Sequence, residues 1–149
     1  MSKKQNMQKA LKAAMKARDE DAKRTLRLAL ASIKLAEVEL GAEIDDSRIL
    51  GILQKEIKTR DDAIEEANQA NRDDLIQQAQ REKSILNQFL PKQMEEDELR
   101  ALISGIIEKT GAKGMQDMGM VMKNLMPELQ GRASGQEASR VVRELLQNN

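Results

Sequence analysis

The side chains that could do chemistry in this sequence are limited to carboxylates, lysines, serines and threonines, because it contains no Cys and no His. Thiolate nucleophiles, the commonest general base and the commonest zinc ligands are therefore excluded. Acids cluster at residues 61–66 and 95–98, but acids near the start of a helix ordinarily interact with its dipole. General acid–base catalysis needs a cleft that perturbs the pKa, and no cleft is visible in the sequence. We predict no catalytic residue, no metal site, no cofactor and no enzymatic activity of the chain alone.

Positive charge is concentrated in the first part of the chain, where it could bind an anionic partner. Residues 1–34 hold 10 Lys or Arg against 3 Asp or Glu, residues 35–90 hold 7 against 13, and residues 91–149 hold 8 against 9. Helical spacing groups these cations into two stripes: Lys9, Lys12 and Lys16, then Lys23, Arg27 and Lys34. Such stripes can follow nucleic-acid phosphates. The alternative, which the pattern slightly favours, is that they are solvated residues pairing with the acidic middle of the chain.

Glycine-rich turns in the last third are a second candidate for anion binding. The two turns are Gly111-Ala112-Lys113-Gly114 and Gly131-Arg132-Ala133-Ser134-Gly135. Glycine admits backbone conformations closed to other residues, and N–H groups at helix starts can hold a phosphate. Ordinary turn formation explains these glycines equally well.

The elements that position these residues are expected to be helices. The chain has one aromatic residue, Phe89, and nine Met, and its commonest residues favour helices over strands. Apolar periodicity predicts helices over about 3–18, from Asp19 to Gly41, from Ser47 towards 68, and from Asn71 to Phe89. The second helix carries two apolar stripes, Leu26, Ala29, Leu30 and Ile33, and Leu28, Ala31, Leu35 and Val38. Two stripes predict neighbours on both sides of this helix.

Pro91 is the strongest break in the pattern, because proline disfavours helical geometry in the residue before it. Beyond it we predict three short helices: one closed by Gly111, one broken near Pro127, and one started by a Ser134–Glu137 capping box. The predicted fold is all-α. Its domains are an N-terminal helical bundle (1–90), a linker (91–94) and a small C-terminal three-helix domain (95–149).

No apolar run approaches the roughly 20 residues needed to span a bilayer; the best candidate, residues 26–40, is interrupted by charges. We predict no membrane association. The first 18 residues carry six Lys or Arg and no acid, as in a transit peptide, but they are periodic like a packed helix. We therefore expect mature protein in the cytoplasm.

Separated motifs in both halves resemble one known family. The stretches Leu11–Asp19, Thr25–Arg27 and Leu90–Gln93 are similar to the stand-alone YqeY family. The stretches Met118–Lys123, Gly131–Ala133 and Val142–Leu146 resemble the tail domain of the B subunit of the tRNA-dependent Asp/Glu amidotransferase. The resemblance implies a tRNA-related role, associated with glutamine-dependent carbon–nitrogen ligase activity, whose catalytic domains are not found in this chain.

Carried over to this sequence, the tail-domain resemblance gives the candidate RNA contacts Lys113, Gly114, Lys123, Gly131 and Arg132. Gln130 stands where the family often has Lys or Arg, which weakens the case for phosphate binding there. The six cations of the first two helices are secondary candidates. Two functions stay open: a non-catalytic module that binds tRNA or another structured RNA, and an adaptor that docks on an amidotransferase, an aminoacyl-tRNA synthetase or another protein.

Overall fold

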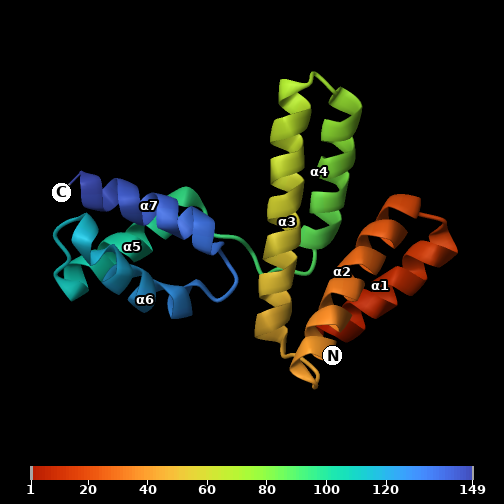
Figure 1. The fold of residues 1–149 in the computed structure, drawn as a ribbon, viewed down its shortest axis with the longest axis horizontal. Helices are drawn as coiled ribbons and strands as arrows, with labels where there is room; N and C mark the ends of the chain where they lie inside the picture. The colour runs from red at the N-terminus through yellow and green to blue at the C-terminus, as the bar shows by residue number, and fades with distance from the viewer. Residues whose placement is uncertain (1, 149) are drawn as a thin grey trace. The chain divides into compact units, whose positions relative to one another are not determined.

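The computed structural model describes residues 2–148, which contain α-helices, one short 3-10 turn and no strand. The prediction of an all-α fold is confirmed (Figure 1). The elements are α1 (Lys3–Ala17), α2 (Glu20–Leu40), α3 (Asp46–Gln69), α4 (Asp73–Asn87), α5 (Glu96–Thr110), η1 (Met115–Asp117), α6 (Met118–Leu129) and α7 (Gly135–Gln147).

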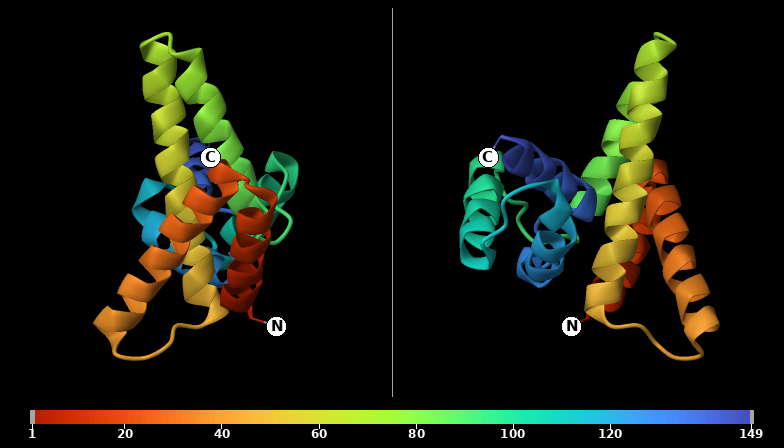
Figure 2. Two further views of the ribbon diagram at one scale, coloured as in Figure 1. Left: turned by 90° about the vertical axis from the view of Figure 1, so that its right-hand side faces the viewer. Right: turned by 60° about the vertical axis from the view of Figure 1, so that its left-hand side comes forward.

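The chain forms two compact units, Met1–Leu90 and Pro91–Asn149, and each is described by itself. In the first unit, α1 and α2 form one antiparallel hairpin and α3 and α4 form another (Figure 2). Both hairpins contribute fully buried side chains to one core: Met7, Leu26, Ile33, Ile49, Leu53 and Leu86. That each unit is an independently folding domain stays a prediction.

Side-chain caps explain where the first three helices begin. Ser2 and Gln5 form a reciprocal capping box at α1, while Asp19 and Asp45 accept hydrogen bonds from the first turns of α2 and α3. Gly41 ends α2 in the left-handed conformation, with φ of 76°, which glycine adopts without steric cost. The starts of α1, α2 and α3 and the end of α2 therefore have a direct physical basis, whereas α4 begins after Arg72 without a side-chain cap.

The second unit is a three-helix core of α5, α6 and α7 around buried aliphatic side chains such as Ile103, Val121 and Val142. As predicted, Gly111 closes α5 with φ of 72° and Ser134 caps α7. The predicted break near Pro127 is wrong, because α6 continues through it to Leu129. Leu129 is buried in the core, so its packing holds the last turn although proline removes one helical hydrogen bond.

The segment predicted as a linker is hydrogen-bonded to the turn between α6 and α7. The Met94 N–H donates to the Arg132 carbonyl at 2.8 Å, and the Arg132 Nε donates to the Lys92 carbonyl at 2.9 Å. The Gln93 amide donates to the Gly131 carbonyl at 3.0 Å, and Arg132 also pairs with Glu98. Residues 92–94 are thereby tied to the second unit.

Replacing Arg132→Ala should release Lys92 from this turn. Losing a hydrogen bond and an exposed ion pair costs roughly 1 kcal/mol, so trypsin cleavage after Lys92 should rise about fivefold. Mass spectrometry of timed digests measures that rate. Arg143→Ala is the control, since Arg143 is exposed and has no described partner; equal rates in both variants would contradict a tethering role for Arg132.

The Thr25 side chain is fully buried in the first unit, and its hydroxyl oxygen is the one buried side-chain polar atom among residues 2–148 without a hydrogen-bond partner. Thr25→Val keeps the branched shape and removes this unsatisfied group, so the free energy of unfolding should rise by about 1 kcal/mol. Urea titration measures the change. Thr59→Val is the control, because its hydroxyl already donates to the Lys55 carbonyl; a loss of stability in Thr25→Val would show that its hydroxyl is satisfied.

Candidate binding surfaces

The described residues form three surfaces that could bind a partner. Within residues 2–148, no group of three or more His, Cys, Asp or Glu is placed to hold a metal ion. None of the helices described is both long and apolar enough to cross a membrane. The surfaces left to consider are the two glycine turns, the cationic faces of α1 and α2, and an apolar groove.

The first glycine turn places Lys113 at the surface between α5 and η1. The Lys113 backbone N–H is already used, since it donates to the Asp117 carboxylate at 2.9 Å. Gly114 has extended backbone, with φ of −167°, which any residue adopts. The turn therefore presents an exposed Lys113 side chain whose own backbone N–H is bound to a carboxylate, and Gly114 is not in a conformation reserved for glycine.

The second glycine turn places Gly131 in the left-handed region, with φ of 77°, so glycine is favoured there. Arg132 follows it, but its guanidinium is engaged with Glu98 and with the Lys92 carbonyl. Lys123 is exposed on α6. Of the candidates in the second unit, Lys113 and Lys123 have exposed side chains without ion pairs among the described residues, whereas the partly exposed Arg132 is engaged by Glu98 and the Lys92 carbonyl.

The cationic stripe on α1 faces solvent. Lys9 and Lys16 each follow a buried residue, Met7 and Ala14, by two positions, which turns their side chains roughly 200° away from the core. Lys12 lies between them, and all three are exposed. None of the three forms an ion pair with another described residue, so this face holds three uncompensated charges.

The α2 stripe is divided between paired and unpaired cations. Lys23 lies 3.6 Å from Glu20, whereas Arg27 and Lys34 are exposed and form no ion pair among residues 2–148. The alternative that these cations pair with the acidic middle of the chain is wrong for the described structure, because none of the six forms an ion pair with residues 35–90; Lys4, which lies outside the stripes, pairs with Glu37 of that part. Five of the six stripe cations thus remain available to an outside anion.

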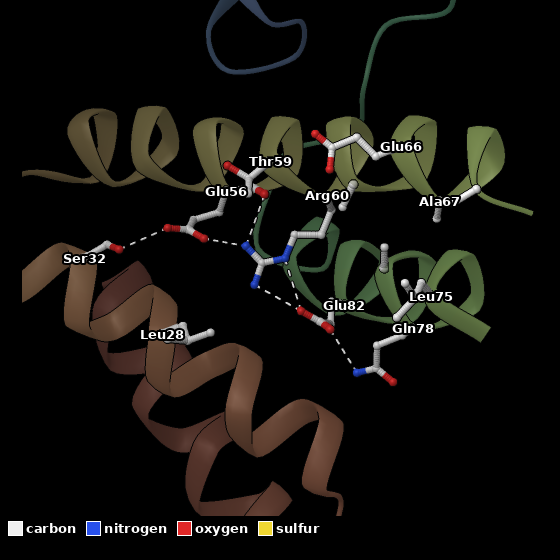
Figure 3. A pocket seen from close by; sticks show the side chains of 13 residues that line it. Leu28, Ser32, Glu56, Thr59, Arg60, Glu66, Ala67, Leu75, Gln78 and Glu82 are labelled. Atoms are coloured by element: carbon white, nitrogen blue, oxygen red, sulfur yellow. Dashed lines mark hydrogen bonds and ion pairs between the residues drawn. The ribbon is translucent and has the colours of Figure 1, made fainter. Parts of the chain in front are cut away.

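An apolar groove of about 730 Å³ lies between α2 and the α3–α4 hairpin (Figure 3). Much of its wall is small side chains, because α3 and α4 place alanines there. Its lining residues are Leu28, Ser32, Glu56, Thr59, Arg60, Ala63, Glu66, Ala67, Ala70, Leu75, Gln78, Ala79 and Glu82. We call this hollow the α2 groove.

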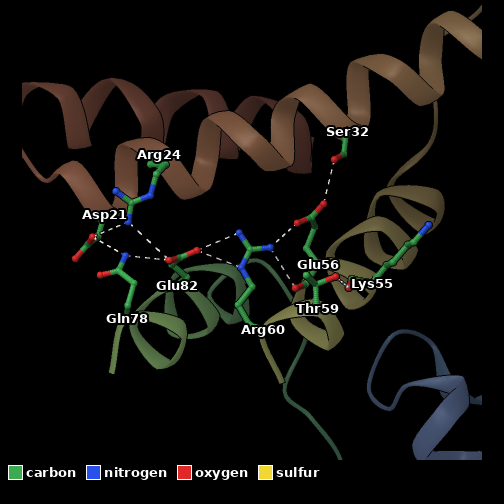
Figure 4. A network of polar contacts seen from close by, with 9 residues as sticks. All are labelled: Asp21, Arg24, Ser32, Lys55, Glu56, Thr59, Arg60, Gln78 and Glu82. Carbon is green, nitrogen blue, oxygen red and sulfur yellow. Dashed lines mark hydrogen bonds and ion pairs between the residues drawn. The ribbon is translucent and has the colours of Figure 1, made fainter. Parts of the chain in front are cut away.

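A polar network crosses the α2 groove and joins its three helices (Figure 4). The guanidinium of Arg60, on α3, lies 2.5 Å from Glu56 and 3.2 Å from Glu82 of α4. Glu56 accepts a hydrogen bond from Ser32 of α2, and Glu82 lies 3.7 Å from Arg24 of the same helix. The one buried cation of the described chain is therefore satisfied by two carboxylates that both reach α2.

Two further carboxylates fasten α2 to its neighbours in ionised form. Hydrogen bonds from Gln78 and from Arg24 lower the pKa of Asp21, which also pairs with Arg81 of α4. A hydrogen bond from Lys4 of α1 lowers the pKa of Glu37. Because hydrogen bonds to the charged form favour ionisation, both ties are charged at neutral pH.

The second apolar stripe of α2 lacks the neighbour that the sequence predicted. Leu28, Leu35 and Val38 are 51%, 61% and 69% exposed. The prediction that neighbours cover both stripes is wrong for Leu35 and Val38 in the described first unit, although α2 contacts α1 as well as α3 and α4. The second stripe begins at the α2 groove, because Leu28 is part of the groove wall.

Sequence reasoning missed Arg60 and its partners. Glu56 and Arg60 have the i,i+4 spacing of a helical ion pair, which is the one signal that could have drawn attention to them. Such pairs are usually solvated, and nothing in the spacing says that Glu82, 22 residues later, completes the network. The groove itself depends on side chains from three helices.

Comparison with known proteins finds relatives named "Altered inheritance of mitochondria protein 41, mitochondrial". The one from Pyrenophora tritici-repentis is 29% identical over 94% of this chain and 78% of its own length. That from Lachancea thermotolerans is 36% identical over 57% of this chain and 46% of its own, and that from Saccharomyces cerevisiae 32% over 80% and 65%. In the latter two, the matched region is less than two thirds of the relative.

These names contradict the expectation of a cytoplasmic location, because each relative is called mitochondrial. The expectation was drawn from the periodicity of residues 1–18. That periodicity is explained by α1, which packs with Met7 fully buried. Packing accounts for how this segment folds, and it does not determine the compartment in which a protein works.

The family comparison covers both units of the chain. The model of the YqeY family, described as "Yqey-like protein", matches residues 4–146. The match runs from the first turn of α1 to the last turn of α7 and agrees with the motifs that suggested this family from the sequence. The chain belongs to the YqeY family.

Proposed function

We propose that this chain is a non-catalytic module that binds structured RNA, with tRNA as the expected class, through the cationic faces of α1 and α2. The observation that carries the proposal is the set of exposed cations without an ion pair among the described residues: Lys9, Lys12, Lys16, Arg27 and Lys34. Cations held on helices can replace the counterions of a phosphate backbone, which favours binding through counterion release.

The spacing on α1 adds a second reason. Lys9, Lys12 and Lys16 are three and four residues apart, so their like charges repel one another in the free protein. A phosphate backbone lying across them relieves that repulsion. The only aromatic residue, Phe89, is partly buried in the core of the first unit, so no aromatic ring stacks on bases and the contacts read mainly backbone and shape.

The second unit has a smaller part in this proposal. Lys113 and Lys123 are additional phosphate contacts, Gly114 and Gly131 shape the turns near them, and Arg132 acts by holding residues 92–94. With 8 basic residues against 9 acidic ones, this unit has no overall attraction for an anion. The tail-domain resemblance supports tRNA as the ligand and an amidotransferase or aminoacyl-tRNA synthetase as an associated partner.

The triple variant Lys9→Ala, Lys12→Ala, Lys16→Ala should weaken binding of every tRNA alike, by at least about tenfold at low salt. Each lost phosphate contact should reduce the slope of log affinity against log salt by about 0.7 to 0.9. Filter binding with several purified tRNAs at a series of salt concentrations measures both quantities. Arg27→Ala with Lys34→Ala should show a smaller reduction of the same kind.

The matched control removes the same charge elsewhere: Lys55→Ala, Lys58→Ala, Lys109→Ala, three exposed lysines without ion pairs among the residues described. This control should bind nearly as the wild type does. If the control variant weakens tRNA binding equally, the effect depends only on net charge and not on the α1 face. If Lys113→Ala with Lys123→Ala abolishes binding and the α1 triple does not, the contact lies in the second unit. The absence of measurable tRNA binding at low salt would refute the proposal.

A second candidate function is an adaptor that docks on another protein. The observation that favours it is the exposed stripe of Leu28, Leu35 and Val38 on α2, which is continuous with the α2 groove. Contiguous exposed apolar surface bordered by polar residues is typical of protein interaction sites. This function needs no cation and can coexist with RNA binding.

A further inference from the structure

We infer that the α2 groove and the stripe beside it bind an amphipathic helix of a partner protein, one that carries Lys or Arg next to its apolar face. The inference gives the adaptor function its surface and does not depend on RNA binding. It rests on three properties of the groove: its unfilled wall, its length along α2, and its charge.

The wall of the groove is built to receive a side chain from outside. Ala67 and Ala79 are buried at 3% and 7% exposure, and Ala63 lies exposed one turn before Ala67. These small side chains leave the groove open between Leu28 and Leu75, which are both about half exposed. A Leu, Met or Phe of a partner would bury its surface there and cover both leucines.

The apolar surface has the length of a helix contact. Leu28, Leu35 and Val38 recur at helical spacing along one face of α2, and the ten residues between the first and the last correspond to about 15 Å, or three turns. A helix laid into a groove is read by anchors at spacings of three, four and seven residues. One anchor of such a helix enters the groove while the following anchors lie on Leu35 and Val38.

The charge of the groove selects a cationic helix. Its wall contains the carboxylates Glu56, Glu66 and Glu82 and one cation, Arg60. Arg60 is engaged with Glu56 and Glu82, and Glu66 is exposed without an ion pair among the residues described. Of the charges at the groove, Glu66 is the one left for a Lys or Arg of the partner, and a Glu of the partner in the same place is repelled by it. Along the stripe α2 itself exposes Arg27 and Lys34, so the cation that the surface favours lies at the end of the partner helix that enters the groove.

The probe is a fluorescent 18-residue peptide of Leu and Lys whose leucines form one helical face. Two matched peptides replace its Lys by Glu or scramble the order so that the apolar face is lost. Fluorescence anisotropy should show binding of the Leu/Lys peptide, and at least tenfold weaker binding of the other two. Ala63→Leu fills the groove from an exposed helical position and should lower the affinity for the Leu/Lys peptide at least tenfold. The double variant Leu35→Gln with Val38→Gln should lower it by a similar factor.

Matched variants distinguish binding in the α2 groove from non-specific binding of the peptide. Glu66→Lys should weaken the peptide severalfold, while Glu65→Lys, the same charge change on an exposed residue outside the groove, should have little effect. Met120→Gln with Met126→Gln removes exposed apolar side chains from the second unit and should bind as the wild type does. Circular dichroism confirms that each variant is folded. If these controls weaken binding as much as the groove variants do, the inference is overturned.

Two outcomes identify a different occupant. Equal binding of the Leu/Lys and Leu/Glu peptides would contradict the preference for a cationic partner helix. A concentration-dependent dimer in analytical ultracentrifugation that Leu35→Gln with Val38→Gln abolishes would assign the surface to a second copy of this chain. The same groove variants should still retain tRNA, and the α1 lysine triple should still bind the peptide, so that failure of one function is distinguished from failure of the other.

Discussion

The arrangement of the first unit depends on the buried guanidinium of Arg60. Removing a cation from water is costly unless carboxylates and good hydrogen-bond geometry compensate for it, and here Glu56 and Glu82 supply both. These carboxylates reach Ser32 and Arg24, so one charged network sets the position of α2 against the α3–α4 hairpin. Because polar contacts bridge the helices at this place, the neighbouring alanines need not fill the space, and a groove is left between them.

The outer faces of α1 and α2 are exposed because the chain has few large apolar side chains. The chain has a single aromatic residue, and its core is made of aliphatic side chains and one buried methionine on a single stripe of each helix. The remaining faces are therefore exposed, and two of them are distinctive: the unpaired cations, which suit phosphates, and the stripe of Leu28, Leu35 and Val38, which suits a helix. Both lie on helices, which gives them fixed spacing and low entropic cost of binding.

Family membership extends over both units, since the match covers residues 4–146. The match therefore includes the helical hairpins of the first unit as well as the three helices of the second. In the second unit, Arg132 connects the turn before α7 to residues 92 and 98. Arg132, a cation in a glycine turn, thus has a structural role, whereas Lys9, Lys12 and Lys16 of α1 form no ion pair among the described residues.

The helices, their caps and the all-α class can be predicted from the sequence, because they depend on neighbours within about four residues: Ser134 with Glu137, Asp19 with Ala22, and Gly41 and Gly111 as stops. The cationic and apolar stripes can be located in the same way. Which of these stripes remain exposed depends on how the helices pack. Arg60 meets Glu82 across 22 residues of chain, Arg132 meets Lys92 across 40, and Pro127 stays helical because Leu129 is buried. Burial and ion pairing between distant residues depend on how helices pack, and the spacing within one helix carries no information about its partner.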